Sequence, residues 1–162
     1  MSRRTRRTVL VLHIVSSGAW VGIDVLLGTL ALTAWFSSSD QVAALAYQAL
    51  GLFVWWPMAV SALVCLLSGL LLGLGTKYGL LRYWWVAVKL AMNLVLLTLV
   101  VFLLRPGLDD VEEYGRQLAQ GDDAGLDVSF LFFPPLVSLT ALTIAMGLSV
   151  FKPWGRTRGS RR

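Results

Sequence analysis

Charged side chains are scarce in this sequence. Asp, Glu, Lys and Arg together make up 14% of its 162 residues, whereas a soluble domain carries about 25%. Hydrophobic residues make up 57%, and this excess of apolar side chains must face lipid. The shortage of charge therefore excludes an ordinary soluble domain and predicts an integral membrane protein.

Histidine and cysteine are rarer still, because the chain has one of each, His13 and Cys65. A single cysteine makes no intrachain disulfide and no thiolate cluster. A single histidine cannot supply both axial ligands of a bis-His haem, and it makes a poor metal cluster with Cys65 and Asp24, which lie at other depths. We therefore expect no metal and no cofactor.

Long apolar runs, in contrast, are abundant. A helix needs about 20 apolar residues to cross the hydrocarbon core of a bilayer. Four stretches meet this requirement, namely residues 9–36, 51–74, 83–104 and 128–151. The sequence thus predicts an all-α fold in which residues 1–162 form one domain, a polytopic bundle of four transmembrane helices.

Two further features refine this topology. Pro57 predicts a kink in the second span, because proline lacks the N–H that a helix interior requires. An outer loop is expected at residues 105–127, opened by Pro106 and Gly107. Within this loop, apolar residues at helical spacing predict a short amphipathic helix on the outer surface: Leu108, Val111 and Leu118.

Basic residues gather on one side of the predicted topology. Of the fourteen Lys and Arg, four precede the first span, two lie between the second and third spans, and five follow the fourth. Because cytoplasmic loops are positively charged, both termini are predicted to lie in the cytoplasm, with the chain in the inner (plasma) membrane of the cell. The net charge of +5 then reflects topology and contact with membrane lipids, and binding to nucleic acid is not expected.

The first span carries a polar stripe. Placed at 100° per residue, four side chains fall within about 60° of one another: His13, Ser17, Trp20 and Asp24. Gly18 and Gly22 lie roughly opposite this stripe, at a spacing that lets a second helix approach closely. The first helix is therefore expected to contact neighbours on two sides.

The other spans also carry narrow bands of small or polar residues. The second holds Ser61, Cys65 and Ser68 with Gly69 and Gly73, the third Lys89 and Asn93, and the fourth Ser138, Ala145 and Ser149. At 1.5 Å per residue, Lys89 falls near the depth of His13, whereas Ser61 and Ser138 fall near that of Asp24. The sequence thus predicts two polar levels in the bundle, one in the cytoplasmic half and one in the outer half.

Each level allows alternatives. In the outer level, Asp24 is expected either to form a hydrogen bond with Ser61 or Ser138, or to pair with Lys89, whose side chain would have to extend across about 10 to 12 Å of depth. A charge at the bilayer centre costs at least about 2.5 to 3.5 kcal/mol, so Asp24 is also a candidate functional group. In the cytoplasmic level there are two alternatives. Lys89 and Asn93 together bind an anionic head group or a carbonyl oxygen of a lipophilic ligand, or the Lys89 side chain extends toward the cytoplasm without a ligand.

Three sequence stretches carry a resemblance to known proteins. The first helix reads LHIVSSGAWVG, the second ends SGLLLGLGTKYGLLRYWW, and the third continues VAVKLAMNLVLLTLVVFLLRPGL. This combination resembles a family of small bacterial predicted integral membrane proteins of unassigned function, with these matching residues: His13, Trp20, Gly75, Trp85 and Lys89. The LHxxxxxxW start is more distantly similar to copper-resistance D-type membrane proteins. Copper or haem handling would need further His or Met ligands, and there is no second His. The resemblance implies a four-helix membrane protein and no particular chemistry.

Three functions fit these observations. In the favoured function, the protein binds a lipophilic small molecule inside the bundle, or it is a subunit of a membrane complex or homo-oligomer that assembles through the paired glycines. The expected ligand-binding residues are His13, Ser17, Trp20, Asp24, Ser61, Lys89, Asn93 and Ser138. The second is a small membrane enzyme in which Asp24 is the catalytic acid or base and Lys89 and Asn93 orient a hydrophobic substrate. The third is a proton-coupled exporter of small molecules that uses Asp24.

Overall fold

The described part of the chain is helical apart from its connections. The structure, a computed structural model, describes residues 1–76, 79–122, 125–155 and 157. Within these residues, four helical rods are long and apolar enough to cross a membrane: Arg3–Phe36, Asp40–Leu74, Trp84–Ala119 and Ser129–Phe151. The prediction of an all-α chain with four such helices is confirmed.

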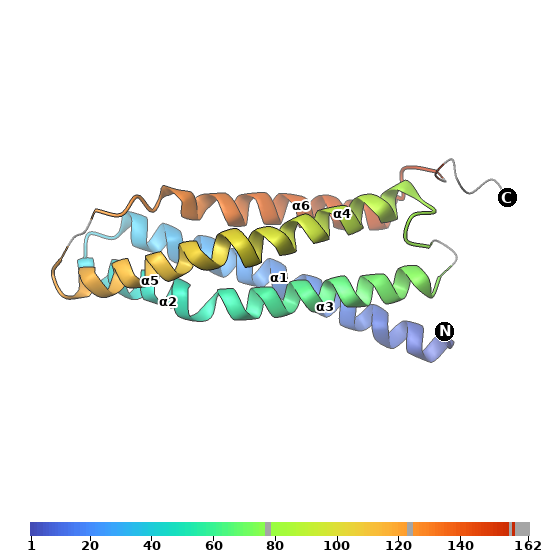
Figure 1. The fold of residues 1–162 in the computed structure, drawn as a ribbon, viewed down its shortest axis with the longest axis horizontal. Helices are drawn as coiled ribbons and strands as arrows, with labels where there is room; N and C mark the ends of the chain where they lie inside the picture. Colours follow the sequence, from blue (N-terminus) through green and yellow to red (C-terminus); the bar gives the residue numbers. More distant parts are fainter. Residues whose placement is uncertain (77–78, 123–124, 156, 158–162) are drawn as a thin grey trace.

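The N-terminus and the C-terminal end of the last helix lie at the same end of the bundle (Figure 1). We call this the terminal end, and the opposite one the far end. Several basic residues used to predict orientation lie outside the described residues: Lys77, Arg156, Arg158, Arg161 and Arg162.

The first rod is α1 (Arg3–Phe36), which begins six residues before the predicted span. Its N-terminus is capped because the Thr5 N–H donates to Ser2 Oγ at 3.1 Å. The side of α1 that packs against the bundle carries Trp20, Asp24, Leu27 and Ala31 at helical spacing, all buried.

The two glycines of the first helix, Gly18 and Gly22, have open space next to them. A Cβ built at Gly18 or Gly22 meets no atom of the described chain within 4 Å. Within the described chain, no other helix therefore packs directly against these two positions. Their use between chains stays a prediction.

The second rod bends where its two helices meet. It consists of α2 (Asp40–Phe53) and α3 (Trp55–Leu74), which are joined at Val54. Pro57 has no N–H for the Phe53 carbonyl, so the helical hydrogen bond between these positions is missing. The predicted kink thus lies one turn before the proline, as α2 and α3 show in Figure 1.

The third rod corrects the predicted outer loop. Helix α4 (Trp84–Leu99) passes through a π-helical turn (Val100–Leu104) into α5 (Arg105–Ala119) without leaving the rod. The Arg105 N–H donates to the Val100 carbonyl, five residues earlier, and this wider turn accommodates Pro106. The amphipathic helix expected inside residues 105–127 therefore continues the third span instead of following a break at Pro106.

Packing against α2 explains why α5 is part of the bundle. Its apolar face buries Leu108 and Val111. A Cβ at Gly115 would lie 2.9 Å from the Ala44 carbonyl oxygen, so only glycine allows this approach of the two backbones. The rings of Tyr47 and Tyr114 contact each other across the same interface, with centroids 5.4 Å apart.

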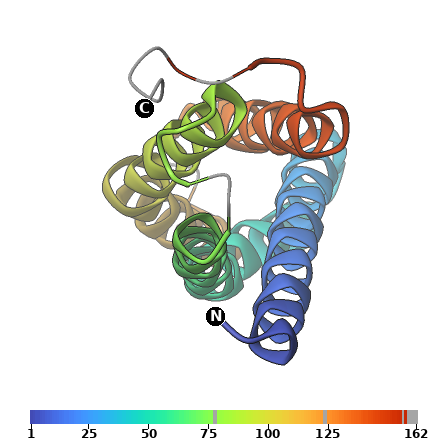
Figure 2. The same ribbon diagram turned by 90° about the vertical axis from the view of Figure 1, so that its right-hand side faces the viewer.

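The fourth rod begins with a 3-10 turn (Ser129–Phe132) and continues as α6 (Phe133–Phe151). Pro134 and Pro135 fall in its first turn, where the missing N–H groups have no helical partner to lose. Near the far end, α6 contacts α1, since a Cβ at Gly28 would lie 3.9 Å from Pro135. Toward the terminal end α1 moves away from α6 (Figure 1), and the end-on view shows α1, α3, α4 and α6 arranged around the bundle axis (Figure 2).

Candidate functional site: a cavity between four helices

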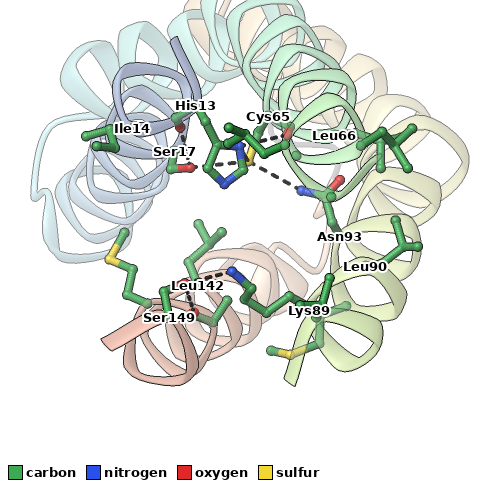
Figure 3. Close-up of a pocket in the computed structure, with 18 of the residues that line it drawn as sticks. His13, Ile14, Ser17, Cys65, Leu66, Lys89, Leu90, Asn93, Leu142 and Ser149 are labelled. Carbon is green, nitrogen blue, oxygen red and sulfur yellow. Dashed lines mark hydrogen bonds between the residues drawn. The ribbon is translucent and has the colours of Figure 1, made fainter. Parts of the chain in front are cut away.

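A cavity of about 620 Å³ lies in the terminal half of the bundle, where α1 and α6 separate. Its walls come from α1, α3, α4 and α6 (Figure 3). Most of its lining is aliphatic, as in Leu10, Leu66, Leu90, Leu96 and Leu142.

His13 forms a polar point on one wall. Its Nδ1 lies 3.0 Å from the Cys65 carbonyl oxygen and 3.0 Å from Ser68 Oγ. Because a carbonyl oxygen only accepts, Nδ1 donates its hydrogen, and in the neutral ring Nε2 is then an acceptor. Figure 3 shows Nε2 directed into the cavity. Gly69 makes room for the ring, because a Cβ there would lie 3.3 Å from His13 Cε1.

The Cys65 thiol joins three helices beside His13. Ser17 Oγ lies 3.2 Å from Cys65 Sγ and donates to the His13 carbonyl at 2.7 Å. From α4, Asn93 Nδ2 donates to the same sulfur at 3.5 Å. Ser17 and Asn93 thus hold α1 and α4 against α3 on this side of the cavity.

Lys89 occupies the opposite wall. Its Nζ donates to Ser149 Oγ at 2.7 Å and lies 5.0 Å from the centroid of the Trp85 ring. Arg6 also lines the cavity, near its terminal end. None of the described residues around the cavity is Asp or Glu. The cavity thus combines aliphatic walls with positive charge.

The second predicted polar level lies outside this cavity. Ser138 Oγ donates to Asp24 Oδ2 at 2.6 Å, and the Asp24 side chain is completely buried. Of the two serines considered for Asp24, Ser138 is the one that bonds it. Lys89 donates to Ser149 instead of reaching Asp24, so the alternative of an ion pair between Lys89 and Asp24 is not found.

Two buried polar atoms near this bond lack a partner. Asp24 Oδ1 and Trp20 Nε1 make no hydrogen bond within the described part of the chain. They lie one turn apart on the buried side of α1, above the cavity toward the far end.

The structure brings half of the predicted ligand-binding residues together. His13, Ser17, Lys89 and Asn93 line the cavity, whereas Trp20, Asp24, Ser61 and Ser138 do not. Sequence reasoning missed Ser149 as the partner of Lys89, although Ser149 was recognised on the polar stripe of its span. The length of the lysine side chain could have indicated this partner, because it carries Nζ of Lys89 toward the terminal end.

These features define the class of protein, an all-helical chain with four helices long and apolar enough to cross a membrane and a cavity between them. Within the described ranges, no group of three His, Cys, Asp or Glu side chains is placed to hold a metal ion. No protein-family model, curated protein or solved structure matches this chain.

Proposed function

We propose that this chain is an integral protein of the inner (plasma) membrane, with both termini in the cytoplasm, that binds a lipophilic small molecule in the cavity. Its four apolar rods support membrane insertion. Large apolar side chains on the outside support it too, since Phe102, Phe133 and Phe151 are mostly exposed. The arginines of the N-terminal tail support a cytoplasmic terminal end.

The observation that carries the binding proposal is the cavity itself. Its volume of about 620 Å³ lies within the ~300–1,000 Å³ of small-molecule sites. Apolar walls with a few converging polar groups are typical of such sites. His13, Lys89 and Ser149 provide these polar groups from three different helices.

Asp24 has no part in this proposal. A catalytic acid or base must reach its substrate, and a proton-coupled carrier must expose its acid to the transport path. Asp24 does not line the cavity and is bonded to Ser138. We propose that it joins α1 to α6 at the closed end of the cavity.

Two glycine variants test the binding proposal. Gly18 lines the cavity and Gly22 does not, yet a Cβ at either meets nothing within 4 Å. Gly18→Leu is therefore expected to occupy cavity space without a clash, and Gly22→Leu is its matched control. The probe is hexadecanol with a diazirine in mid-chain, photolysed with the protein in neutral-lipid nanodiscs, and labelled peptides are mapped by mass spectrometry.

We expect the probe to label peptides around Leu66, Leu96 and Leu142. Gly18→Leu lowers this labelling about fivefold, the factor that corresponds to ~1 kcal/mol of overpacking. Gly22→Leu leaves the labelling unchanged. Absence of cavity labels in the unmodified protein, or equal labelling of both variants, would overturn the proposal. Light scattering compares the molar mass of Gly22→Leu with that of the unmodified protein, and so tests separately whether the helix face with Gly18 and Gly22 joins two chains.

A further inference from the structure

We propose that the ligand is an anionic amphiphile drawn from the bilayer, with its acidic head group at Lys89 and its apolar chain toward the far end of the cavity. This inference rests on the proposed binding function and adds the chemical class of the ligand. It follows from the charge, the shape and the opening of the cavity.

The charge of the cavity has one sign. Lys89 Nζ contacts a neutral hydroxyl on Ser149 and the neutral ring of Trp85. Arg6 adds a second cation, and the described lining contains no carboxylate. A cation at membrane depth is costly and is usually paired. An acidic head group would supply the opposite charge that this lining lacks.

The charged side chains of the cavity lie toward one end of it. It follows α1 from Arg6 to Gly18, a length of about 18 Å at 1.5 Å per residue. Arg6, Lys89 and Ser149 lie toward the terminal end of this length. Among the residues that the structure describes, the part toward the far end holds no Lys, Arg, Asp or Glu, and it is lined by Leu66, Leu96 and Leu142 together with the polar side chains of Ser17 and Asn93. This gradient matches a molecule with a charged head and an extended apolar chain.

The opening of the cavity identifies the source of the ligand. Two lining residues on facing helices are well exposed, Ile14 on α1 at 60% and Val150 on α6 at 73%. Both are aliphatic, so the gap between α1 and α6 opens onto the apolar surface of the bundle. Beyond it, the bond between Asp24 and Ser138 holds the two helices together. A ligand therefore reaches the cavity sideways, from among the lipid chains.

Carboxylates and phosphates both suit a lysine, which binds anions as a point charge. Three diazirine probes with the same chain separate these possibilities: hexadecanol, hexadecanoic acid and hexadecyl phosphate. They are compared in neutral-lipid nanodiscs at a pH at which both acids are ionised. The variants are Lys89→Gln, Lys89→Arg and Lys152→Gln, the last of which removes a lysine that does not line the cavity.

We expect an acidic probe to label the cavity about tenfold more than hexadecanol, as a charge-assisted hydrogen bond predicts. Lys89→Gln abolishes this excess, whereas Lys89→Arg and Lys152→Gln retain it. The acid that is labelled more strongly identifies the head group.

Two outcomes would overturn the inference. Equal labelling by all three probes, or an acid excess that persists in Lys89→Gln, would show that Lys89 does not select an anion. If hexadecanol labels the cavity while the acids do no better, the binding proposal survives and only the ligand class fails. If no probe labels the cavity, the proposed function fails with it.

Discussion

Removal of the Ser138 hydroxyl tests the contact that holds α1 to α6. Ser138 Oγ donates to Asp24 Oδ2 at 2.6 Å, and Oδ1 of the same carboxyl makes no other hydrogen bond within the described residues. Ser138→Ala therefore leaves a fully buried carboxyl without a donor. Polar contacts between membrane helices contribute about 0.6 kcal/mol on average and up to ~1.7 kcal/mol. Loss of a donor to a buried acceptor costs ~1–3 kcal/mol. We expect Ser138→Ala to lower the free energy of unfolding by about 1.5 kcal/mol.

The assay is reversible unfolding in mixed micelles, followed by tryptophan fluorescence. Thr140→Val is the matched control, because the Thr140 hydroxyl bonds only the Leu136 carbonyl of its own helix. Such a surface substitution should change the free energy of unfolding by no more than about 0.5 kcal/mol. With Asp24→Ala and the double variant, a thermodynamic cycle should give a coupling of ~1 kcal/mol. A coupling near zero, or equal effects of Ser138→Ala and Thr140→Val, would refute the account of this bond.

Four further predictions concern the fold. Gly115→Ala should lower the free energy of unfolding by about 1–3 kcal/mol, because its Cβ would meet the Ala44 carbonyl oxygen at 2.9 Å. Gly147→Ala, whose Cβ meets nothing within 4 Å, should raise the free energy of unfolding by ~0.5–1 kcal/mol. The same effect of both variants in the unfolding assay would contradict these two predictions. Pro57→Ala restores an N–H opposite the Phe53 carbonyl, so hydrogen exchange at residue 57 should be protected as in the middle of α3; rapid exchange there would show that Pro57 does not cause the bend. The Ser129 N–H donates to Asp127 Oδ1 at 3.0 Å, and this bond and the Ser129 hydroxyl lower the pKa of Asp127. The stabilisation of the folded state by this bond should be present above the ordinary pKa of an aspartate and be lost as the pH falls through the lowered pKa of Asp127. NMR titration of the Asp127 carboxyl carbon measures this pKa. An unshifted titration midpoint, or the same loss of stability in acid for Asp127→Asn, would contradict the prediction.

The apolar runs and the polar stripes could be interpreted from the sequence because both depend on local periodicity. Depth counted along each helix correctly separated Lys89 from Asp24. It could not choose between Ser61 and Ser138 as the partner of Asp24, because that choice depends on how each helix is rotated about its axis. Lys89 met Ser149 rather than a residue at its own depth because its long side chain moves the charge away from its Cα.

Glycine spacing was a weaker guide than the neighbours of each glycine. A Cβ at Gly18 or Gly22, which have the GxxxG spacing, meets nothing in the described chain, whereas Gly115, which has no glycine four residues away, brings two backbones into contact. Pro106 indicated a helix end, yet the π-helical turn before it keeps the third rod continuous. A single sequence does not show which helix will lie opposite a small residue, nor that a wider turn will absorb a proline.

The cavity and its occupant are tested most directly by an experimental density map of the protein purified in native lipid. We predict elongated density between α1, α3, α4 and α6, with its head within hydrogen-bonding distance of Lys89 Nζ and Ser149 Oγ and its chain toward Leu96 and Leu142. A map in which side chains close this space, or in which bound density has its polar end away from Lys89, would contradict the account.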